Sequence, residues 1–298
     1  MCGIVGLFLK DKKLQSDLGG MLTAMLITMT NRGPDSAGIA IYGPGCEEKS
    51  KLTIQSDNPI NDFKNLVDDL EKTLGCNVSI TKKDTHAVLY LPTSSIDAAR
   101  DQIAMREKSI RVMSCGNSIE IYKEVGLPVE VARRFQIETM SGSHGIGHTR
   151  MATESEVTTM GAHPFSTGDD QCLVHNGSLS NHNRLRSNLL RNGAKIETDN
   201  DSEVAAAYLT LQMQRGSTLG EALNSSLTDL DGFFTFVVGT KYGFGVVRDP
   251  IACKPAVMAE TDQYVAFGSE YRALVNLPHI DNARVWEPEP ATVYFWTH

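Results

Sequence analysis

The chain has 298 residues, enough for one large or two modest domains with a substantial buried core. Its net charge is −8, with acidic and basic residues interspersed, which argues against a nucleic acid or an anionic membrane as partner. No window approaches the ~18 apolar residues of a membrane span and no leader pattern opens the chain, so we expect a soluble, cytoplasmic protein that meets small molecules or other proteins.

The first elements read as strand, helix and strand. The apolar run from Cys2 to Phe8 predicts a core strand. Apolar residues then recur with helical spacing from Leu18 to Met29, which predicts a helix that lies on a sheet. The turn-forming run 31–36 ends this helix, and residues 37–42 return as a strand.

The stretch from about 46 to 142 is richer in Lys, Asp and Glu and interrupts this pattern. It predicts helices at about 60–74, 96–107 and 127–136, and strands at 77–81, 86–91, 109–114 and 118–123. We interpret it as a small α+β unit inserted into a single domain that spans 1–298. Contact with another subunit and simple structural embellishment are both open as its role.

The host pattern resumes with strands at 144–150 and 171–175, the second closed by Asn176-Gly177. Helices follow at 183–191 and 204–215, and Thr218 and Glu221 have the spacing of a capping box for another. The last third is β-rich, with strands at 233–239, 243–248, 256–260, 264–268 and 292–296. Strands at both ends that enclose paired helices predict an α+β protein with stacked sheets between helical layers.

Six cysteines stand far apart, without the Cys-x-x-Cys pair of a metal site, so we expect no metal and mainly structural, reduced thiols. Cys2 is the exception, because removal of Met1 would leave a thiol and a free α-amine on one terminal residue. Such an amine titrates near ~7.7–8.0, so part of it is neutral at pH 7.5 and can take the thiol proton. Alternatively, Cys2 is a small buried hydrophobe at the start of a strand.

A cysteine that attacks an amide needs an oxyanion hole and a grip on the substrate. The Asn176 side-chain amide and the Gly177 N–H could donate to the oxyanion, although Asn-Gly is more often a hairpin turn. Arg150 offers a planar fork for a carboxylate and Asp201 a carboxylate for an ammonium group, so together they would select a free α-amino acid. A surface ion pair and a helix cap are the alternatives.

Six motifs stand in a fixed order along the chain: Met1-Cys2-Gly3-Ile4-Val5-Gly6, Arg32-Gly33-Pro34-Asp35-Ser36-Ala37-Gly38, Gly147-His148-Thr149-Arg150-x-Ala152-Thr153, Ala162-His163-Pro164, His175-Asn176-Gly177 and Asp201-Ser202-Glu203. In this order they resemble the class II glutamine amidotransferases, a branch of the N-terminal-nucleophile hydrolases. The resemblance continues through residues 248–250, 254–255 and 267–270, and covers the whole chain except the insert.

The resemblance implies a four-layer αββα sandwich and assigns a role to each position. Cys2 would attack the γ-carboxamide of glutamine, its α-amine would act as base and then as acid, and Asn176 and Gly177 would form the oxyanion hole. The other implied contacts are with the amino-acid part of the substrate: Arg150 and Thr153 at the α-carboxylate, Asp201 at the α-ammonium, and Arg32 and His163 around the pocket. Met151 and Glu154 stand where some family members carry an aromatic residue and a histidine, a departure that concerns glutamine affinity rather than the chemistry.

Family members fuse this domain to a synthase that consumes the ammonia, whereas this chain stops at His298, so we expect a separate partner subunit. A chain of this length with a mid-domain insert resembles the glutamine amidotransferase subunit of N-methylglutamate synthase, an enzyme of methylamine metabolism, and of glutamate-synthase-like complexes. This resemblance implies glutamine or a γ-glutamyl amide as substrate and no cofactor in this chain. It places FMN, or FMN with an iron–sulfur cluster, in glutamate-synthase-like partner subunits.

Two other functions are open. The chain could be a catalytically silent subunit of such a complex that keeps the pocket only to sense glutamine; the intact set of catalytic and binding residues favours the active enzyme. A metal hydrolase built on His144, His148, His163 and His175 has little support, because no carboxylate–histidine ligand spacing accompanies these residues.

Overall fold

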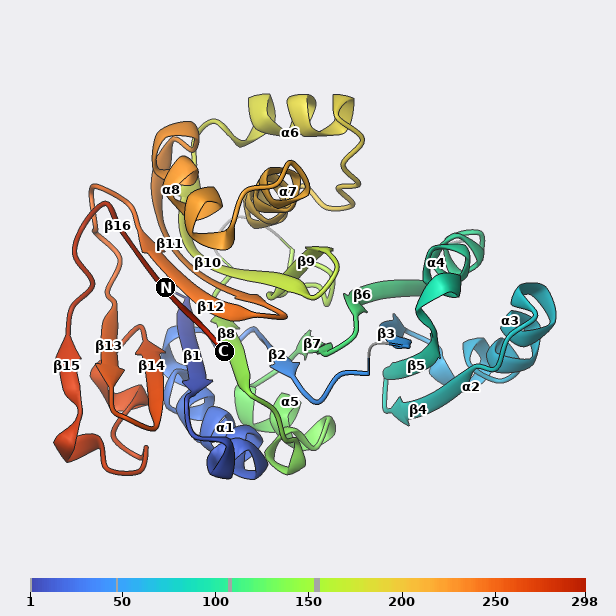
Figure 1. Cartoon of the computed structure of the whole chain (residues 1–298), viewed down its shortest axis with the longest axis horizontal. Helices are drawn as coiled ribbons and strands as arrows, with labels where there is room; N and C mark the ends of the chain where they lie inside the picture. The colour runs from blue at the N-terminus through green and yellow to red at the C-terminus, as the bar shows by residue number, and fades with distance from the viewer. Residues whose placement is uncertain (1, 47, 107–108, 153–155) are drawn as a thin grey trace.

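A computed structural model describes residues 2–46, 48–106, 109–152 and 156–298 of the chain (Figure 1). Within these residues, seven antiparallel strands form one sheet in the order β15 (Arg284–Trp286), β13 (Val257–Glu260), β14 (Tyr264–Gly268), β1 (Gly3–Leu9), β8 (His144–Arg150), β2 (Ser36–Tyr42) and β7 (Ile119–Val125). Another five strands of the described ranges form a second sheet, in the order β16 (Thr292–Thr297), β12 (Gly243–Arg248), β11 (Gly232–Thr240), β10 (Gln171–Leu179) and β9 (Phe165–Gly168).

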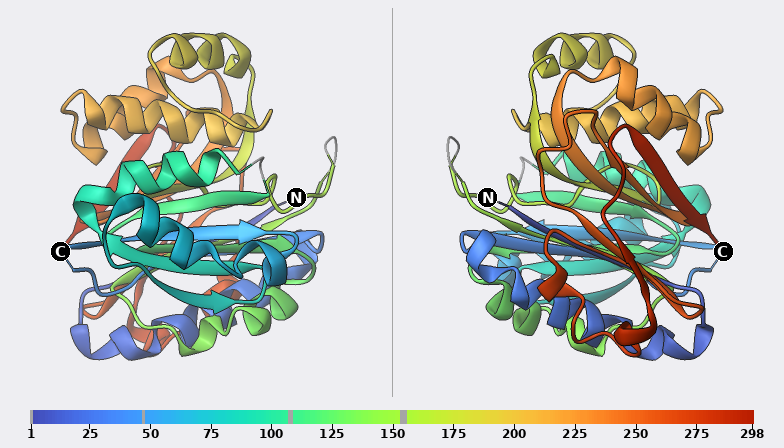
Figure 2. Two further views of the ribbon diagram at one scale, coloured as in Figure 1. Left: turned by 90° about the vertical axis from the view of Figure 1, so that its right-hand side faces the viewer. Right: turned by 90° about the vertical axis from the view of Figure 1, so that its left-hand side faces the viewer.

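Helices cover the outer faces of both sheets. α1 (Leu18–Thr28) and α5 (Pro128–Arg134) pack on the seven-stranded sheet, and α7 (Asp201–Gln214) and α8 (Leu219–Asp229) pack on the five-stranded sheet, with α6 (His182–Arg191) against α7. The predicted four-layer αββα sandwich is therefore confirmed (Figure 1). β1 begins on the side of the molecule opposite to the C-terminal end of β16 (Figure 2).

Strand β1 is buried along its whole length, between α1 and the second sheet. Val5 and Leu7 point into the core beneath α1, while Ile4 and Phe8 point into the core between the sheets, as the two-residue period of a strand requires. Gly6 also faces the second sheet, where an added Cβ would lie 2.7 Å from the Phe244 ring. Packing on both faces fixes the start of β1, and with it the position of Cys2.

The insert has a sheet and a core of its own. Its strands run in the order β4 (Ser79–Lys83), β5 (His86–Pro92), β3 (Lys49–Ser56) and β6 (Ile110–Gly116), and its helices are α2 (Pro59–Asp62), α3 (Leu66–Leu74) and α4 (Ile96–Ala104). The last part of the predicted 46–142 stretch, from β7 onward, contributes elsewhere, because β7 and α5 belong to the host layers. The insert abuts these elements through His86, whose ring packs on Tyr122 and Phe135.

The structure corrects several expected elements. β3, β9 and β15 were not expected, and the helix expected at 60–74 is divided into α2 and α3. Asn176 and Gly177 do not form a turn, because β10 continues through them to Leu179. Short 3-10 helices connect other elements: Lys12–Asp17, Thr30–Arg32, Thr93–Ser95, Ile137–Thr139, Tyr271–Ala273 and Ile280–Asn282. In the described part of the chain, no helix has both the length and the apolar character needed to cross a membrane.

Candidate active site

Cys2 lies immediately before β1, as a half-buried free cysteine. The next residue, Gly3, pairs with Thr149 of the antiparallel strand β8, so Cys2 and Arg150 lie at the same end of neighbouring strands. A Cβ on Gly3 would lie 2.7 Å from Oγ1 of Thr149 and 2.8 Å from Cβ of Met29. The residue after the cysteine must therefore be a glycine for the chain to enter the sheet at this point.

Arg32 holds the backbone of Cys2. Its Nε donates to the carbonyl oxygen of Cys2 across 2.9 Å, and its Nη1 forms a 2.7 Å ion pair with Glu270. The neighbouring Ser269 accepts a hydrogen bond from the Ile4 N–H on its Oγ and donates its own N–H to the Ile4 carbonyl, both at 2.9 Å. Segments from both ends of the chain thus fix the first residues of β1.

The glycine after Arg32 brings the same turn against the end of β8. A Cβ on Gly33 would lie 2.4–2.5 Å from backbone atoms of Thr149 and Arg150. The N–H of Asp35 donates to the Arg150 carbonyl across 3.1 Å. The Arg150 side chain is buried, and its Nη1 donates to the carbonyl of Glu156 across 3.2 Å. The guanidinium is therefore held beside the loop that follows β8.

The two predicted oxyanion donors lie within β10, in the second sheet. Asn176 is buried, and its Nδ2 donates to the carbonyl of Cys2 across 3.3 Å. Gly177 has a φ of +153°, and a Cβ there would lie 2.0 Å from the carbonyl oxygen of Phe233. The glycine thus allows close approach of β10 and β11 and keeps Asn176 beside the predicted nucleophile.

Asp201 is the first residue of α7, where the helix dipole favours its anionic form. One carboxylate oxygen accepts the Leu179 N–H across 2.9 Å, and the other lies 3.7 Å from Nδ1 of His175. Burial alone would raise the pKa of this carboxyl, but its interactions with His175 and with the Leu179 N–H outweigh burial and lower the pKa to about 2. Asp201 is therefore an anion at neutral pH.

Ser202, the next residue, joins two buried histidines. Its hydroxyl lies 2.8 Å from Nε2 of His163 and 2.9 Å from Nδ1 of His175. The ring of His163 stacks on that of His148, whose Nε2 binds the His175 carbonyl across 3.1 Å. Burial lowers the pKa of His148 to about 3 and that of His163 well below its usual range. The rings of His148 and His163 are therefore neutral.

Lys123 of β7 anchors the loop that carries His163. Its buried Nζ donates to three backbone carbonyls of that loop, at distances of 2.8 to 3.3 Å: Met160, Ala162 and Pro164. Burial lowers the pKa of Lys123 to about 8, against the attraction of Glu203 and Glu197. The loop position thus depends on a cation from the neighbouring strand.

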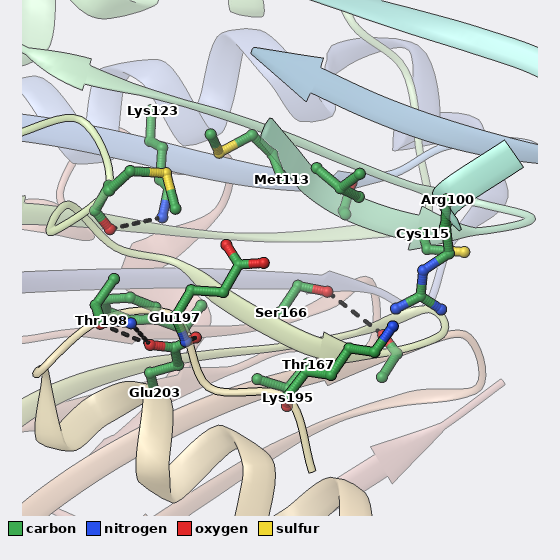
Figure 3. A pocket seen from close by; sticks show the side chains of 15 residues that line it. Arg100, Met113, Cys115, Lys123, Ser166, Thr167, Lys195, Glu197, Thr198 and Glu203 are labelled. Carbon is green, nitrogen blue, oxygen red and sulfur yellow. Dashed lines mark hydrogen bonds between the residues drawn. The ribbon is translucent and has the colours of Figure 1, made fainter. Parts of the chain in front are cut away.

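A cavity lies behind this loop, between the insert and α7. Figure 3 shows Lys123 at one end and Arg100 and Cys115 of the insert at the other, with Glu197 between them. On its α7 side, the Glu203 carboxylate accepts hydrogen bonds from the N–H and hydroxyl of Thr198. The residues that line this cavity do not include Cys2 or its neighbours, so it is distinct from the candidate active site.

The structure brings most of the predicted site residues together. Contacts at or next to the start of β1 join Cys2, Arg32, Asn176 and Arg150, while Asp201 and His163 meet through Ser202. Thr153 lies outside the described residues. Sequence reasoning missed the contacts of Ser202, Lys123 and Glu270, because a serine after a helix cap and isolated charged residues carry no specific signal.

The histidines of the alternative metal hydrolase have other partners. His144, for example, binds the Ser143 hydroxyl and the Thr240 carbonyl through its two ring nitrogens. In the part of the chain that the structure describes, no group of three or more His, Cys, Asp or Glu side chains could hold a metal ion.

Comparison with solved structures and family models identifies the class. The glutamine amidotransferase domain model matches residues 148–276. A glutamine phosphoribosylpyrophosphate amidotransferase from B. subtilis has a similar fold, with a TM-score of 0.63 over 99% of this chain and 47% of that chain, at 19% sequence identity. The fold is that of the N-terminal-nucleophile hydrolase type of glutamine amidotransferase.

The chain belongs to the glutamine amidotransferase family. It is 66% identical over 298 residues to the glutamine amidotransferase-like protein GlxB of Rhizobium meliloti (strain 1021). The aligned region covers the whole of this chain and 99% of that protein. It is also 34% identical over 315 residues to a putative glutamine amidotransferase of Methanothermobacter thermautotrophicus, covering 98% of each.

Proposed function

We propose that this chain cleaves the γ-amide of glutamine through a Cys2 thioester and passes the released nitrogen to a partner synthase. The observation that carries the proposal is that two side chains converge on the Cys2 carbonyl, Arg32 from the turn after α1 and Asn176 from the second sheet. These contacts hold the Cys2 backbone beside Asn176, the proposed oxyanion donor, and Arg150 lies at the end of the adjacent strand.

In the proposed reaction, the Cys2 thiol gives its proton to the α-amine and attacks the γ-carbon of the amide. The developing oxyanion accepts hydrogen bonds from Nδ2 of Asn176 and the Gly177 N–H. The C–N bond then breaks as the α-ammonium returns the proton to the leaving nitrogen, which yields ammonia and a γ-glutamyl thioester. Water, activated by the same amine, hydrolyses the thioester to glutamate and regenerates the thiol.

The amino-acid part of glutamine would bind to fixed charges. Arg150 would pair with the α-carboxylate, with help from Thr153, and anionic Asp201 would pair with the α-ammonium. Arg32 and His163 would shape the pocket. The low pKa of Asp201 supports this assignment, because the carboxylate then stays charged throughout the neutral range.

For the destination of the nitrogen, we propose an N-methylglutamate synthase or a related glutamate-synthase-like complex. In such a complex the nitrogen passed to the partner would be methylamine, released by hydrolysis of its γ-glutamyl amide. The whole complex would then convert glutamate and methylamine into N-methylglutamate and ammonia, with FMN, or FMN and an iron–sulfur cluster, held by partner subunits. The mid-domain insert supports this assignment, because it carries the resemblance to the subunits of such complexes and provides additional surface for partners. The matches cover 99% of the Rhizobium meliloti protein and 98% of the Methanothermobacter thermautotrophicus protein, so neither relative has a long synthase extension beyond the matched region.

Glutamine labelled with ¹⁵N at the amide tests the amidohydrolase step. The wild-type chain, alone or in its native complex, should release labelled ammonium, and Cys2→Ala should abolish the release. Cys253→Ala is the matched control, because Cys253 is an exposed free cysteine elsewhere in the chain, and it should retain full activity. Glutamine binding without release in every preparation would instead establish the silent, glutamine-sensing subunit.

The partner assignment has its own test. Affinity purification of the chain from its native cell should recover flavin-containing subunits, and the complex should form N-methylglutamate from glutamate and ¹³C-methylamine. Recovery of an active glutaminase whose complex leaves methylamine unchanged would refute the N-methylglutamate synthase assignment while leaving the amidohydrolase intact.

A further inference from the structure

Among the residues that the structure describes, three polar groups lie close to the hydroxyl of Ser202. Nε2 of His163 lies 2.8 Å away, Nδ1 of His175 lies 2.9 Å away, and Oδ1 of Asp201 lies 3.3 Å away. Ser202 itself is 2% exposed, so its hydrogen bonds must be made within the protein. This hydroxyl is the point at which β10, the His163 loop and α7 meet.

The numbers of donors and acceptors around the Ser202 hydroxyl determine where its hydrogen bonds go. A hydroxyl has one hydrogen to donate and two lone pairs to accept with. If Ser202 donated to either histidine, that ring would carry its proton on its other nitrogen, and neither Nδ1 of His163 nor Nε2 of His175 has a hydrogen-bond partner within the described structure. A buried N–H without an acceptor is costly. Ser202 therefore accepts from both histidines and donates to Asp201.

This arrangement holds both oxygens of the Asp201 carboxylate. Oδ2 accepts the Leu179 N–H across 2.9 Å, and Oδ1 accepts the Ser202 hydroxyl. His175 lies too far from Asp201, at 3.7 Å, to supply a direct hydrogen bond in place of the hydroxyl. The carboxylate orientation thus depends on Ser202, and the Ser202 orientation depends on the two imidazoles.

Helix capping does not account for the serine side chain. At the start of α7 the capping residue is Asn200, whose side chain accepts the Ser202 N–H across 2.9 Å. The Ser202 hydroxyl faces the histidines and Asp201 instead. A residue needed only to start the helix would not require a hydroxyl at this position.

We propose that Ser202 is a positioning residue for substrate selection, which aims the Asp201 carboxylate at the α-ammonium group of glutamine. The proposal rests on the proposed function, because it assumes that glutamine binds at this site. Loss of the hydroxyl removes one hydrogen bond to the carboxylate and leaves two buried N–H groups without their acceptor. The site then loses its preference for ligands that carry an α-ammonium, while recognition of the two carboxyl ends remains.

Two competitive inhibitors of the glutaminase reaction separate this role from a general structural one. L-Glutamate carries the α-ammonium and glutarate does not, and the two are otherwise alike. Ser202→Ala should raise the inhibition constant of L-glutamate about 10- to 100-fold, the range expected for a lost hydrogen bond to a charged group, and should change that of glutarate less than threefold. The KM for glutamine should rise with that of L-glutamate, with a smaller effect on kcat. Ser202→Thr, which keeps the hydroxyl, should restore most of the selectivity.

Ser226→Ala provides the matched control. Ser226 is fully buried in the neighbouring helix α8, and its hydroxyl donates to the Leu223 carbonyl across 2.6 Å, so this variant also loses a buried serine hydroxyl. It should leave both inhibition constants unchanged. If Ser202→Ala fails to fold, Ser202→Cys provides the same comparison, because the thiol keeps the shape and offers only a weak donor.

Equal increases for L-glutamate and glutarate in the Ser202 variants, or an unchanged ratio of the two constants, would overturn the proposal while wild-type glutaminase activity persisted. A wild-type chain that neither hydrolyses glutamine nor binds L-glutamate would instead refute the proposed function, and the role of Ser202 would fail with it. Wild-type activity therefore distinguishes the two failures.

Discussion

Arg32 and Glu270 form a 2.7 Å ion pair that connects the turn after α1 with the segment after β14, and the same guanidinium donates to the Cys2 carbonyl. Arg32→Lys removes the fork that reaches both partners. We expect it to lower kcat/KM for glutamine by at least tenfold, because a misplaced nucleophile loses its attack geometry.

Glu270→Gln is the companion variant, since it keeps the shape and removes only the charge. Its side chain is 34% exposed, so solvent screens the ion pair, and we expect a loss below about fivefold. Steady-state glutaminase kinetics on the two variants provide the test. Wild-type activity in Arg32→Lys would show that this contact does not position Cys2.

Asn176→Ala should act on the chemical step. Removal of one oxyanion donor typically lowers kcat about 10²- to 10³-fold, while KM for glutamine should change only a few-fold, because the donor acts mainly in the transition state. Single-turnover measurements of ammonia release would isolate this step. A large rise in KM at constant kcat would assign Asn176 to ground-state binding instead.

Gly33→Ala should prevent correct folding of the site, because its Cβ would lie 2.4–2.5 Å from backbone atoms of β8, which cannot move aside as a flexible side chain can. Gly20→Ala in α1 is the control, since the nearest atom outside its own helix, the Glu138 carbonyl oxygen, would lie 3.9 Å from its Cβ. That control should stabilise the protein by about 0.5–1 kcal/mol through its helix propensity. Urea unfolding measures both variants, and equal stability of the two would contradict the packing argument.

The pH dependence of the reaction should come from the α-amine of Cys2. The neutral amine is the active base, so kcat/KM should rise with pH to a plateau, with a midpoint near ~7.7–8.0. Asp201 should add no ionisation between pH 5 and 9, because its pKa is about 2. A pH profile measured between these limits tests both statements, and an acid limb that disappears in Asp201→Asn would contradict the second.

Asp201 should affect stability in a lower pH range. Its pKa is lowered on folding from 3.8 to about 2, so the stabilisation is fully present above about pH 4 and is lost as the pH falls through 2. Asp201→Asn should therefore flatten the decline of the unfolding midpoint between pH 4 and 2, measured by chemical denaturation. An identical decline in wild type and variant would show that Asp201 does not contribute to it.

Periodic patterns in the sequence predicted most of the host fold. β1 and α1 follow their apolar repeats, and the predicted capping box of Thr218 and Glu221 is present at the start of α8. β3 escaped prediction because only Leu52 and Ile54 of its eight residues are apolar, which is too short an alternation to indicate a strand. The neighbouring Lys51 is buried and paired with Glu120 of β7, a partner that only the tertiary structure supplies.

The candidate active site likewise contains residues that the sequence predicted and contacts that only the tertiary structure supplies. The ordered motifs named Cys2, Arg150 and Asn176, which lie near one another at the start of β1, but the local signal of Asn176-Gly177 favoured a turn. Close packing of Gly177 against Phe233 explains why a glycine stands within a strand. The bridge through Ser202 could not be predicted, because it depends on histidines 39 and 27 residues away along the chain.

The most direct measurement is the intact mass of the purified protein before and after treatment with the glutamine analogue 6-diazo-5-oxo-norleucine. We predict a chain that lacks Met1 and gains one adduct. The Cys2→Ala variant should gain none, and L-glutamine should protect the wild-type chain against the reaction. A chain that retains Met1 and gains no adduct, even within its native complex, would contradict the proposal that Cys2 is the nucleophile.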